Sequence, residues 1–378
     1  MAVAAPAFDN RLKDDPEYTG YTPRVISGRM QEAYLHLGGS QGDVHWGRYA
    51  RQWGPALFDG LLISPTAYST ETIGATLRVW RLRLESFTGR LSDSDSLAAV
   101  PVQRWLIAHR LAADLGRGVW LALVETGVYG GRGAGFDPVL SAPFNLALLS
   151  DFNDSPGGTG FNGFLGADLS VPLSRSVRVE AGGFLDDIQV DDDTLTDRRP
   201  ASYGLSVSAT RSFARAPLLI SLGYTRVSAL AYRNSFNPEL RWAQRDVGLG
   251  RNFSDYDQVL LRAEWRPAQT WSTVLDLSYI RQGAGDFRQI FPPDSVLAQP
   301  GQGFLIRPVH RMPGVRITVV GAPRPGVEIG AELGATRDGA GRSELVAGVR
   351  LNLRADLLRQ RWGAALPALL PSTDRGWP

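Results

Sequence analysis

Apolar and polar residues alternate along most of the chain, in segments of about 8–12 residues that begin near Glu32. The segment 270–281 is typical: one face carries Trp271, Leu275, Leu277 and Tyr279, and the other carries Ser272, Asp276 and Ser278. Because successive side chains of a strand point to opposite sides, this period of two predicts strands with one apolar and one polar face. Similar segments recur as far as residue 354. Together they predict about 16 to 18 strands in a single unit, 31–354.

The polar faces mix arginines and carboxylates with small residues, as at Arg83, Glu85, Arg110, Arg262 and Glu264. Mixed charge of this kind is typical of a water-containing lumen, where each charge must be neutralised or hydrated. Backbone groups in hydrocarbon must pair within the protein, so the sheet is expected to close on itself. The predicted fold class is therefore all-β, a transmembrane antiparallel β-barrel. A soluble β-rich enzyme or binding module is the alternative.

The links between segments alternate in length, as in the hairpins of membrane barrels. Two long links, near 55–70 and 137–152, carry apolar runs that are compatible with short helices plugging one end of the barrel. The segment 1–30 precedes the predicted barrel. Its start, Met1-Ala-Val-Ala-Ala-Pro-Ala, resembles the small-residue end of a signal peptide, and we expect that signal to be trimmed or missed. Residues 355–378 are predicted to form a C-terminal tail.

Composition narrows the functional classes. No apolar run reaches the length of about 18 residues that a membrane-spanning helix needs. The formal net charge of +2 indicates no nucleic-acid partner. The absence of cysteine excludes disulfides and thiolate metal sites, and the 4 histidines have no metal-like spacing. We therefore expect no metal and no cofactor.

Several motifs occur in a fixed order. They are Trp46-Gly-Arg-Tyr-Ala-Arg-Gln-Trp-Gly-Pro, Gly60-Leu-Leu-Ile-Ser-Pro, Arg104-Trp-Leu-Ile-Ala-His-Arg-Leu, Leu123-Val-Glu-Thr-Gly-Val-Tyr-Gly-Gly and Glu180-Ala-Gly-Gly-Phe-Leu-Asp-Asp-Ile. Over roughly 45–190 the chain thereby resembles the capsule assembly protein Wzi family. The second half of the chain resembles that family only as barrel strands.

The resemblance implies a barrel of about eighteen strands with a helical bundle at the periplasmic end, and a lectin-like role in holding capsular or exopolysaccharide at the cell surface. It implies neither catalysis nor a cofactor. The general rule for barrels places long links outside the cell, whereas the resemblance places helix-bearing links in the periplasm, so orientation stays open. This chain is shorter than a typical family member, which puts its sugar-binding loops in doubt.

Candidate residues for polysaccharide binding or plug contact come from these motifs: Arg48, Arg51, Trp53, Arg104, Trp105, Glu125, Glu180, Asp186 and Asp187. Trp53 could stack on a sugar ring, and Arg48 and Arg51 could pair with uronate carboxylates. The alternative is structural, with Trp53-Gly-Pro forming a sharp strand exit and the arginines neutralising lumen acids such as Glu85 or Glu125. We favour the structural role.

The acidic residues Glu180, Asp186, Asp187 and Asp191 to Asp193 are clustered in the sequence. Their spacing fits no EF-hand pattern, so a solvated loop is favoured over a cation site. Asp186 and Asp187 could also tie the lumen to the plug. A glycosidase would need two carboxylates about 5–10 Å apart across a sugar, which many acids could supply by chance, so we expect no enzyme activity.

The sequence therefore predicts a monomeric protein of the cell outer membrane, in contact with outer-membrane lipid, that binds or anchors capsular or exopolysaccharide. The alternative is an outer-membrane porin or substrate channel. The two functions differ in whether the lumen is open.

Overall fold

The computed structural model describes residues 1–9, 18, 26–65, 68–93, 101–143, 145, 147, 160–187, 199–213, 215–235, 237–337 and 341–353. Within this part the chain is nearly all β. A single 16-stranded antiparallel sheet contains every long strand, and each strand pairs with its neighbours in the sequence. Two short strands, β12 and β13, pair only with each other.

The strands of the large sheet are β1 (Ala2–Asp9), β2 (Ser27–Gly39), β3 (Gly42–Arg48), β4 (Glu71–Val79), β5 (Leu82–Arg90), β6 (Gln103–Gly116), β7 (Val119–Gly131), β8 (Gly160–Pro172), β9 (Val177–Asp187), β10 (Ser202–Phe213), β11 (Leu218–Val227), β14 (Tyr256–Ala268), β15 (Trp271–Gln282), β16 (His310–Arg324), β17 (Val327–Arg337) and β18 (Ser343–Leu353). The short elements are the 3-10 turn η2 (Pro238–Leu240), β12 (Ala243–Gln244), β13 (Val247–Gly248) and α2 (Asp294–Leu297).

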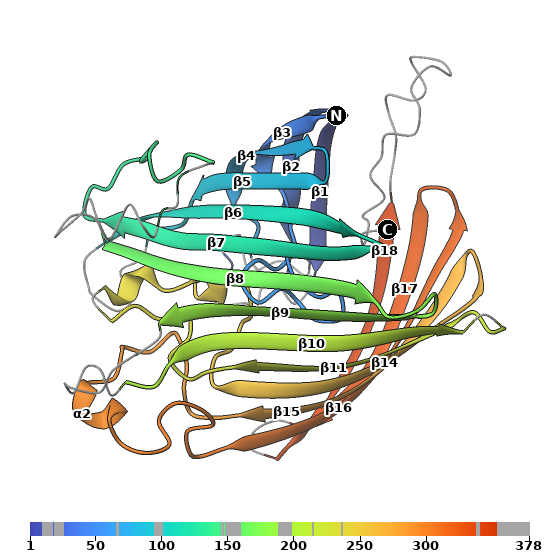
Figure 1. Ribbon diagram of the computed structural model, residues 1–378. Helices are drawn as coiled ribbons and strands as arrows, with labels where there is room; N and C mark the ends of the chain where they lie inside the picture. Colours follow the sequence, from blue (N-terminus) through green and yellow to red (C-terminus); the bar gives the residue numbers. More distant parts are fainter. Residues whose placement is uncertain are drawn as a thin grey trace.

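The sheet curls into a barrel, and Figure 1 shows the strands wrapping around a central space. The predicted antiparallel barrel is confirmed, and its strand number falls within the predicted range. In the described residues β1 pairs with β2 and β18 pairs with β17, and no pairing joins β1 to β18. The sheet begins at Ala2, before the predicted boundary at residue 31, because Ala2–Asp9 pairs along β2 despite its small side chains.

The two faces of the sheet lie in different surroundings. Leucines such as Leu123, Leu165 and Leu222 lie more than half exposed on the outer wall, where hydrocarbon would cover them. Side chains of the other parity, such as Phe164 and Phe184, point inward and are fully buried. The protein's main hydrophobic core therefore lies inside the barrel and not between two layers.

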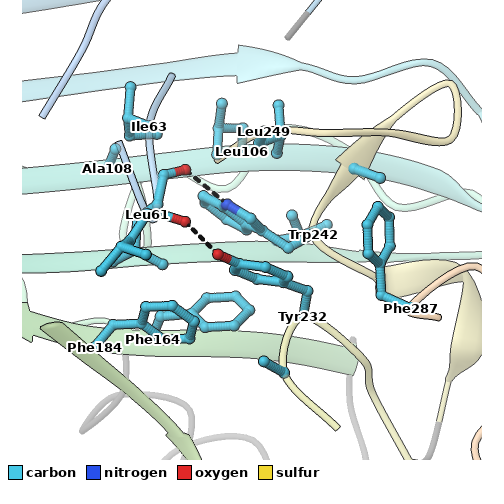
Figure 2. Close-up of a cluster of buried hydrophobic side chains, with 14 of the residues drawn as sticks. Leu61, Ile63, Leu106, Ala108, Phe164, Phe184, Tyr232, Trp242, Leu249 and Phe287 are labelled. Carbon is cyan, nitrogen blue, oxygen red and sulfur yellow. Dashed lines mark hydrogen bonds between the residues drawn. The ribbon is translucent and has the colours of Figure 1, made fainter. Parts of the chain in front are cut away.

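Two long links fill this interior. We call them the plug: residues 49–65 and 68–70, between β3 and β4, together with residues 228–235 and 237–255, between β11 and β14. The main buried cluster combines plug residues with inward-facing wall residues (Figure 2). Its plug members include Trp53, Leu61, Leu62, Ile63, Tyr232, Leu240, Trp242 and Leu249, and its wall members include Phe87, Leu106, Ala108, Val124, Val128, Phe164, Phe184 and Tyr256.

The helix predicted near 55–70 is wrong for the described residues of that link, which form turns and bends. Gly54, Pro55 and Gly60 interrupt the run, and a Cβ at Gly60 would lie 2.0 Å from the Ile63 carbonyl oxygen. The carbonyls of residues 61–63 accept hydrogen bonds from distant donors, so they take no part in a helical ladder. Tertiary contacts therefore fix this link in an extended, looped form.

The second predicted helix, near 137–152, includes residues 144, 146 and 148–152, which lie outside the described part of the chain, as does the tail 355–378. Residues 138–141 form turns. No described helix combines the length and apolar character needed to cross a membrane.

We expect Leu277→Arg to lower the free energy of unfolding by about 2–4 kcal/mol, because Leu277 faces outward in the middle of β15 and an arginine there would enter hydrocarbon. Thr318→Arg is the matched control, since Thr318 lies on the lumen-facing parity of β16. Denaturant unfolding in lipid vesicles, followed by tryptophan fluorescence, measures both. Equal destabilisation by the two variants would contradict the assignment of faces.

Candidate functional site

Three consecutive carbonyls of the first plug link accept hydrogen bonds, two of them from the second plug link. The Tyr232 hydroxyl donates to the Leu61 carbonyl oxygen at 2.6 Å, and the Trp242 indole Nε1 donates to the Leu62 carbonyl oxygen at 2.7 Å (Figure 2). The Ile63 carbonyl accepts from the Trp53 amide at 3.1 Å. These donors are completely buried or nearly so, and a buried carbonyl without a partner would be costly. The hydrogen bonds therefore lock the 49–70 link against the 228–255 link.

Aromatic rings join this pair of links to the barrel wall. The Trp242 ring centre lies 4.9 Å from that of Phe164, and the Tyr232 ring is stacked 5.1 Å from Phe184. Phe287, from the link after β15, packs edge-on against Tyr232 at 6.0 Å. Aromatic pairs at these separations stabilise a core beyond their buried area alone. At these contacts the plug is thus packed directly against the wall, as in a hydrophobic core.

Arg104 anchors the plug through its backbone. Its side chain is fully buried and donates to the carbonyl oxygens of Ser92 at 3.0 Å, Glu239 at 3.2 Å and Ala243 at 3.0 Å. A guanidinium buried in this way is stabilised only where its donors are satisfied. Arg104 therefore holds η2 and β12 against β6, and it offers no free face to a sugar.

Two acidic candidates also contact the plug. Glu180 accepts from the Ala56 amide at 3.2 Å, and Asp186 accepts from the Tyr232 amide at 2.9 Å and from the Ser202 hydroxyl at 3.2 Å. Asp187 ends β9, and its side chain lies outside the described atoms, as do Asp191 to Asp193. Glu180 and Asp186 act here as acceptors for plug amides.

Arg51 and Trp53 are packed inside the plug. Trp53 is 6% exposed and meets Phe87 edge-on at 5.3 Å. The Arg51 guanidinium lies 4.2 Å from the Phe87 ring centre, donates to the Thr72 hydroxyl at 3.3 Å and contacts His45. Burial lowers the pKa of Arg51 to about 10, so it remains charged at neutral pH. Trp53 cannot stack on a sugar unless the plug unpacks, and the partly exposed Arg51 is already engaged with Phe87, Thr72 and His45.

Arg48 is separate from this cluster. It lies at the end of β3 and makes an exposed ion pair with Glu71 at 3.3 Å. An exposed pair of this kind contributes little to stability. Of the three arginines singled out from the sequence, Arg104 is buried, whereas Arg48 and Arg51 are partly exposed.

Trp105 and Glu125 lie on the outer wall. The sequence had instead led us to expect Glu125 among the acids of the lumen. Glu125 shares the parity of the exposed Leu123 on β7, and it pairs with His109 at 3.2 Å. Trp105 stacks on Tyr129 and donates through Nε1 to the Ala134 carbonyl at 3.2 Å. The segment after β7 therefore covers the outside of the barrel here, and this cover allows a carboxylate to lie on the outward face.

Below the plug, the lumen wall carries charges that neutralise each other. Arg110 pairs with Glu85 at 3.1 Å and lies 3.7 Å from Asp168. A small cavity of about 50 Å³ lies there, lined by residues that include Arg110, Trp120, Asp168, Glu180 and the turn Gly54–Pro55. Arg262 pairs with Asp276 at 2.7 Å on the opposite wall. Among the described residues no three His, Asp or Glu side chains gather closely enough to hold a metal ion.

The residues that sequence reasoning missed are Tyr232 and Trp242. The region 232–247 reads as a weak strand, and β12 and β13 do occupy part of it. Tyr232 and Trp242 do not belong to a segment with a period of two, so the hydrophobic pattern gives no sign that their side chains enter the lumen. The signal that could have found them is composition: a link of this length rich in Tyr, Trp and Leu needs somewhere to be buried.

Comparisons with known proteins support the fold. No family model and no curated protein matches the chain. Among solved structures, Wzi of Escherichia coli, an outer-membrane, carbohydrate-binding β-barrel involved in group 1 capsule assembly, matches with a TM-score of 0.59 and 12% identity, over 85% of this chain and 68% of Wzi. OprD of Pseudomonas aeruginosa matches with a TM-score of 0.45 and 10% identity, over 87% of this chain and 80% of OprD.

A third match, OccD3 of Pseudomonas aeruginosa, has a TM-score of 0.45 and 12% identity over 87% of this chain and 78% of the other. At such low identity these likenesses concern the fold alone. The alternating faces, the lumen charges and the fold shared with Wzi agree on one conclusion. The chain is an outer-membrane β-barrel, located in the cell outer membrane.

Proposed function

We propose that this barrel binds or anchors capsular or exopolysaccharide at the cell surface, in a lectin-like role without catalysis. The observation that supports this most directly is the packed plug, because core residues from two links occupy the interior beside β5–β9, β11 and β14 and so narrow the path for a solute. A barrel of about this size whose interior held only water would conduct. The similar fold of Wzi, a carbohydrate-binding β-barrel, supports the same proposal.

The sugar would be held at exposed plug residues and not at the buried motif residues. Phe253 is 50% exposed and lies edge-on to Tyr256 at 6.1 Å. Beside it, Asn252 accepts from Arg288 at 2.6 Å, and this arginine remains partly exposed. An aromatic face next to amide and guanidinium groups provides both stacking and hydrogen bonds for a sugar that carries carboxylates. The protein would act as a monomer surrounded by outer-membrane lipid.

A measurement of ion conductance distinguishes the proposed polysaccharide-binding function from the alternative of a channel. We expect the wild-type protein to show no steady large conductance in planar lipid bilayers. Trp242→Ala should introduce intermittent openings, because it removes the hydrogen bond to Leu62 and the ring packed on Phe164. Trp271→Ala is the control, since Trp271 lies half exposed on the outer wall. A steady large current through the wild-type protein would instead favour the porin function.

Polysaccharide binding is tested at the exposed ring. We expect Phe253→Ala to weaken binding to an acidic capsular polysaccharide about five- to tenfold, through loss of a stacking face. Phe136→Ala is matched to it, because Phe136 is also 50% exposed but lies against Trp105, on the covered outer wall. A glycan array with both variants in detergent measures the effect. Equal loss in the two variants, or no binding by the wild-type protein to any glycan, would count against the proposal.

A further inference from the structure

A row of charged residues crosses the outer wall at the end of the barrel that carries the long links. Register places its members directly opposite one another on successive strands: Arg226 on β11, Asp257 on β14, Arg281 on β15 and Arg311 on β16. Side chains that face each other across a ladder share one face of the sheet. We call this set, together with Arg307, the outer arginine row.

This face is the one that meets lipid. Two positions along each strand from the row lie Tyr224, Val259 and Tyr279, and Val259 and Tyr279 are both more than two-fifths exposed. Tyrosines on the outside of a barrel mark the boundary between hydrocarbon and headgroups. Two residues of a strand span about 6–7 Å. The outer arginine row therefore lies just beyond the apolar band, at the depth of lipid headgroups.

The row has more positive charge than its one carboxylate can neutralise. Asp257 is nearly buried and accepts from Arg281 Nε at 2.9 Å and from the Tyr224 hydroxyl at 3.2 Å. Arg226 is stacked on Phe304, with 3.6 Å between the guanidinium carbon and the ring centre. Arg281 and Arg311 stand directly opposite each other, and like charges in that position destabilise a sheet unless an anion lies between them.

A depression lies where these arginines meet. It has a volume of about 680 Å³ and is lined by Arg281, Leu305, Arg307, Pro308, Val309 and Arg311. Arg307 and Arg311 are exposed, and neither makes a hydrogen bond or ion pair with a residue that the structure describes. Three guanidinium groups therefore border an open space and have donors available for it.

The segment that forms one side of the depression is held firmly against the barrel. The Gly303 carbonyl accepts from the Ala229 amide at 3.0 Å, and the Ile306 carbonyl accepts from the Ala284 amide at 2.9 Å. The Ile306 amide donates to the buried carboxylate of Asp255 at 3.0 Å. Arg307 is thus presented from a fixed backbone, so the arginines can converge without a large entropic cost.

We propose that the outer arginine row binds the phosphate groups of a glycolipid in the surrounding leaflet. Guanidinium forks match phosphate oxygens in geometry and charge, and an anion between Arg281 and Arg311 would relieve their repulsion. Among the described residues the links at this end contain only the short helical elements η2 and α2, and no helical bundle that would place it in the periplasm. The general rule that long links face outward therefore places this end in the outer leaflet, which is built from glycolipids with phosphorylated sugar headgroups. The depth of the row favours a lipid over a soluble polysaccharide. The inference is independent of the proposed sugar-anchoring function.

The test uses the full chain in a neutral detergent, with lipid A as a probe that carries two phosphates. Native mass spectrometry follows the number of bound lipids as the probe is titrated. We expect the double variant Arg307→Gln, Arg311→Gln to weaken binding about tenfold, and we expect dephosphorylated lipid A to bind weakly to every variant. Neither arginine has a described partner, so the substitutions leave no buried charge unpaired. Unchanged circular dichroism and heat-dependent gel mobility check that the barrel is intact.

The control variant Arg215→Gln, Arg324→Gln removes two exposed positive charges from the short-turn end of the barrel. It should bind lipid A as the wild-type protein does. The proposal is overturned if the row variant keeps wild-type affinity, if both variants lose affinity equally, or if phosphorylated and dephosphorylated lipid bind alike. It is also overturned if the row variant loses only binding to an acidic polysaccharide.

Discussion

The constraint on which the structure depends is that a peptide group in hydrocarbon must find its hydrogen-bond partner within the protein. Each unpaired group there costs several kcal/mol, so a sheet can cross a membrane only by curling until nearly all its ladders are filled. The 16-stranded antiparallel order, with each strand paired to its neighbours in sequence, follows from this requirement. The apolar outer wall then follows from the same solvent, since each strand must present alternate side chains to lipid.

The plug obeys a different rule. Apart from the short pair β12–β13, its backbone is not in a ladder, so its polar groups are satisfied one at a time by side chains and by backbone groups of the plug. Tyr232, Trp242 and Arg104 each supply donors to carbonyls that a helix would have used internally. The plug is held by individual hydrogen bonds within an aromatic core, and this packing fixes it inside the barrel.

Much of the barrel could be predicted from the sequence, because a period of two is a local property of each strand. The alternation at 270–281 alone predicts the two faces of β15, and the register bears this out. The site could not be predicted as well. Trp53 looks like a sugar platform in its motif, but its burial depends on residues from distant links. Glu125 looks like a lumen acid because a carboxylate is not expected on the outward face, although its position in β7 puts it there. The segment that covers the wall from outside explains its position.

The sequence separation within the plug bears on how the protein assembles. Leu61 and Tyr232 lie 171 residues apart, and Leu62 and Trp242 lie 180 apart. Hairpins can zip locally as the chain emerges, but these contacts cannot form until the eleventh strand has been made, and such distant closure is slow. A barrel that lacks its later strands therefore also lacks these plug contacts. Packing of the plug therefore requires that residues up to Trp242, well past the midpoint of the chain, have joined the barrel.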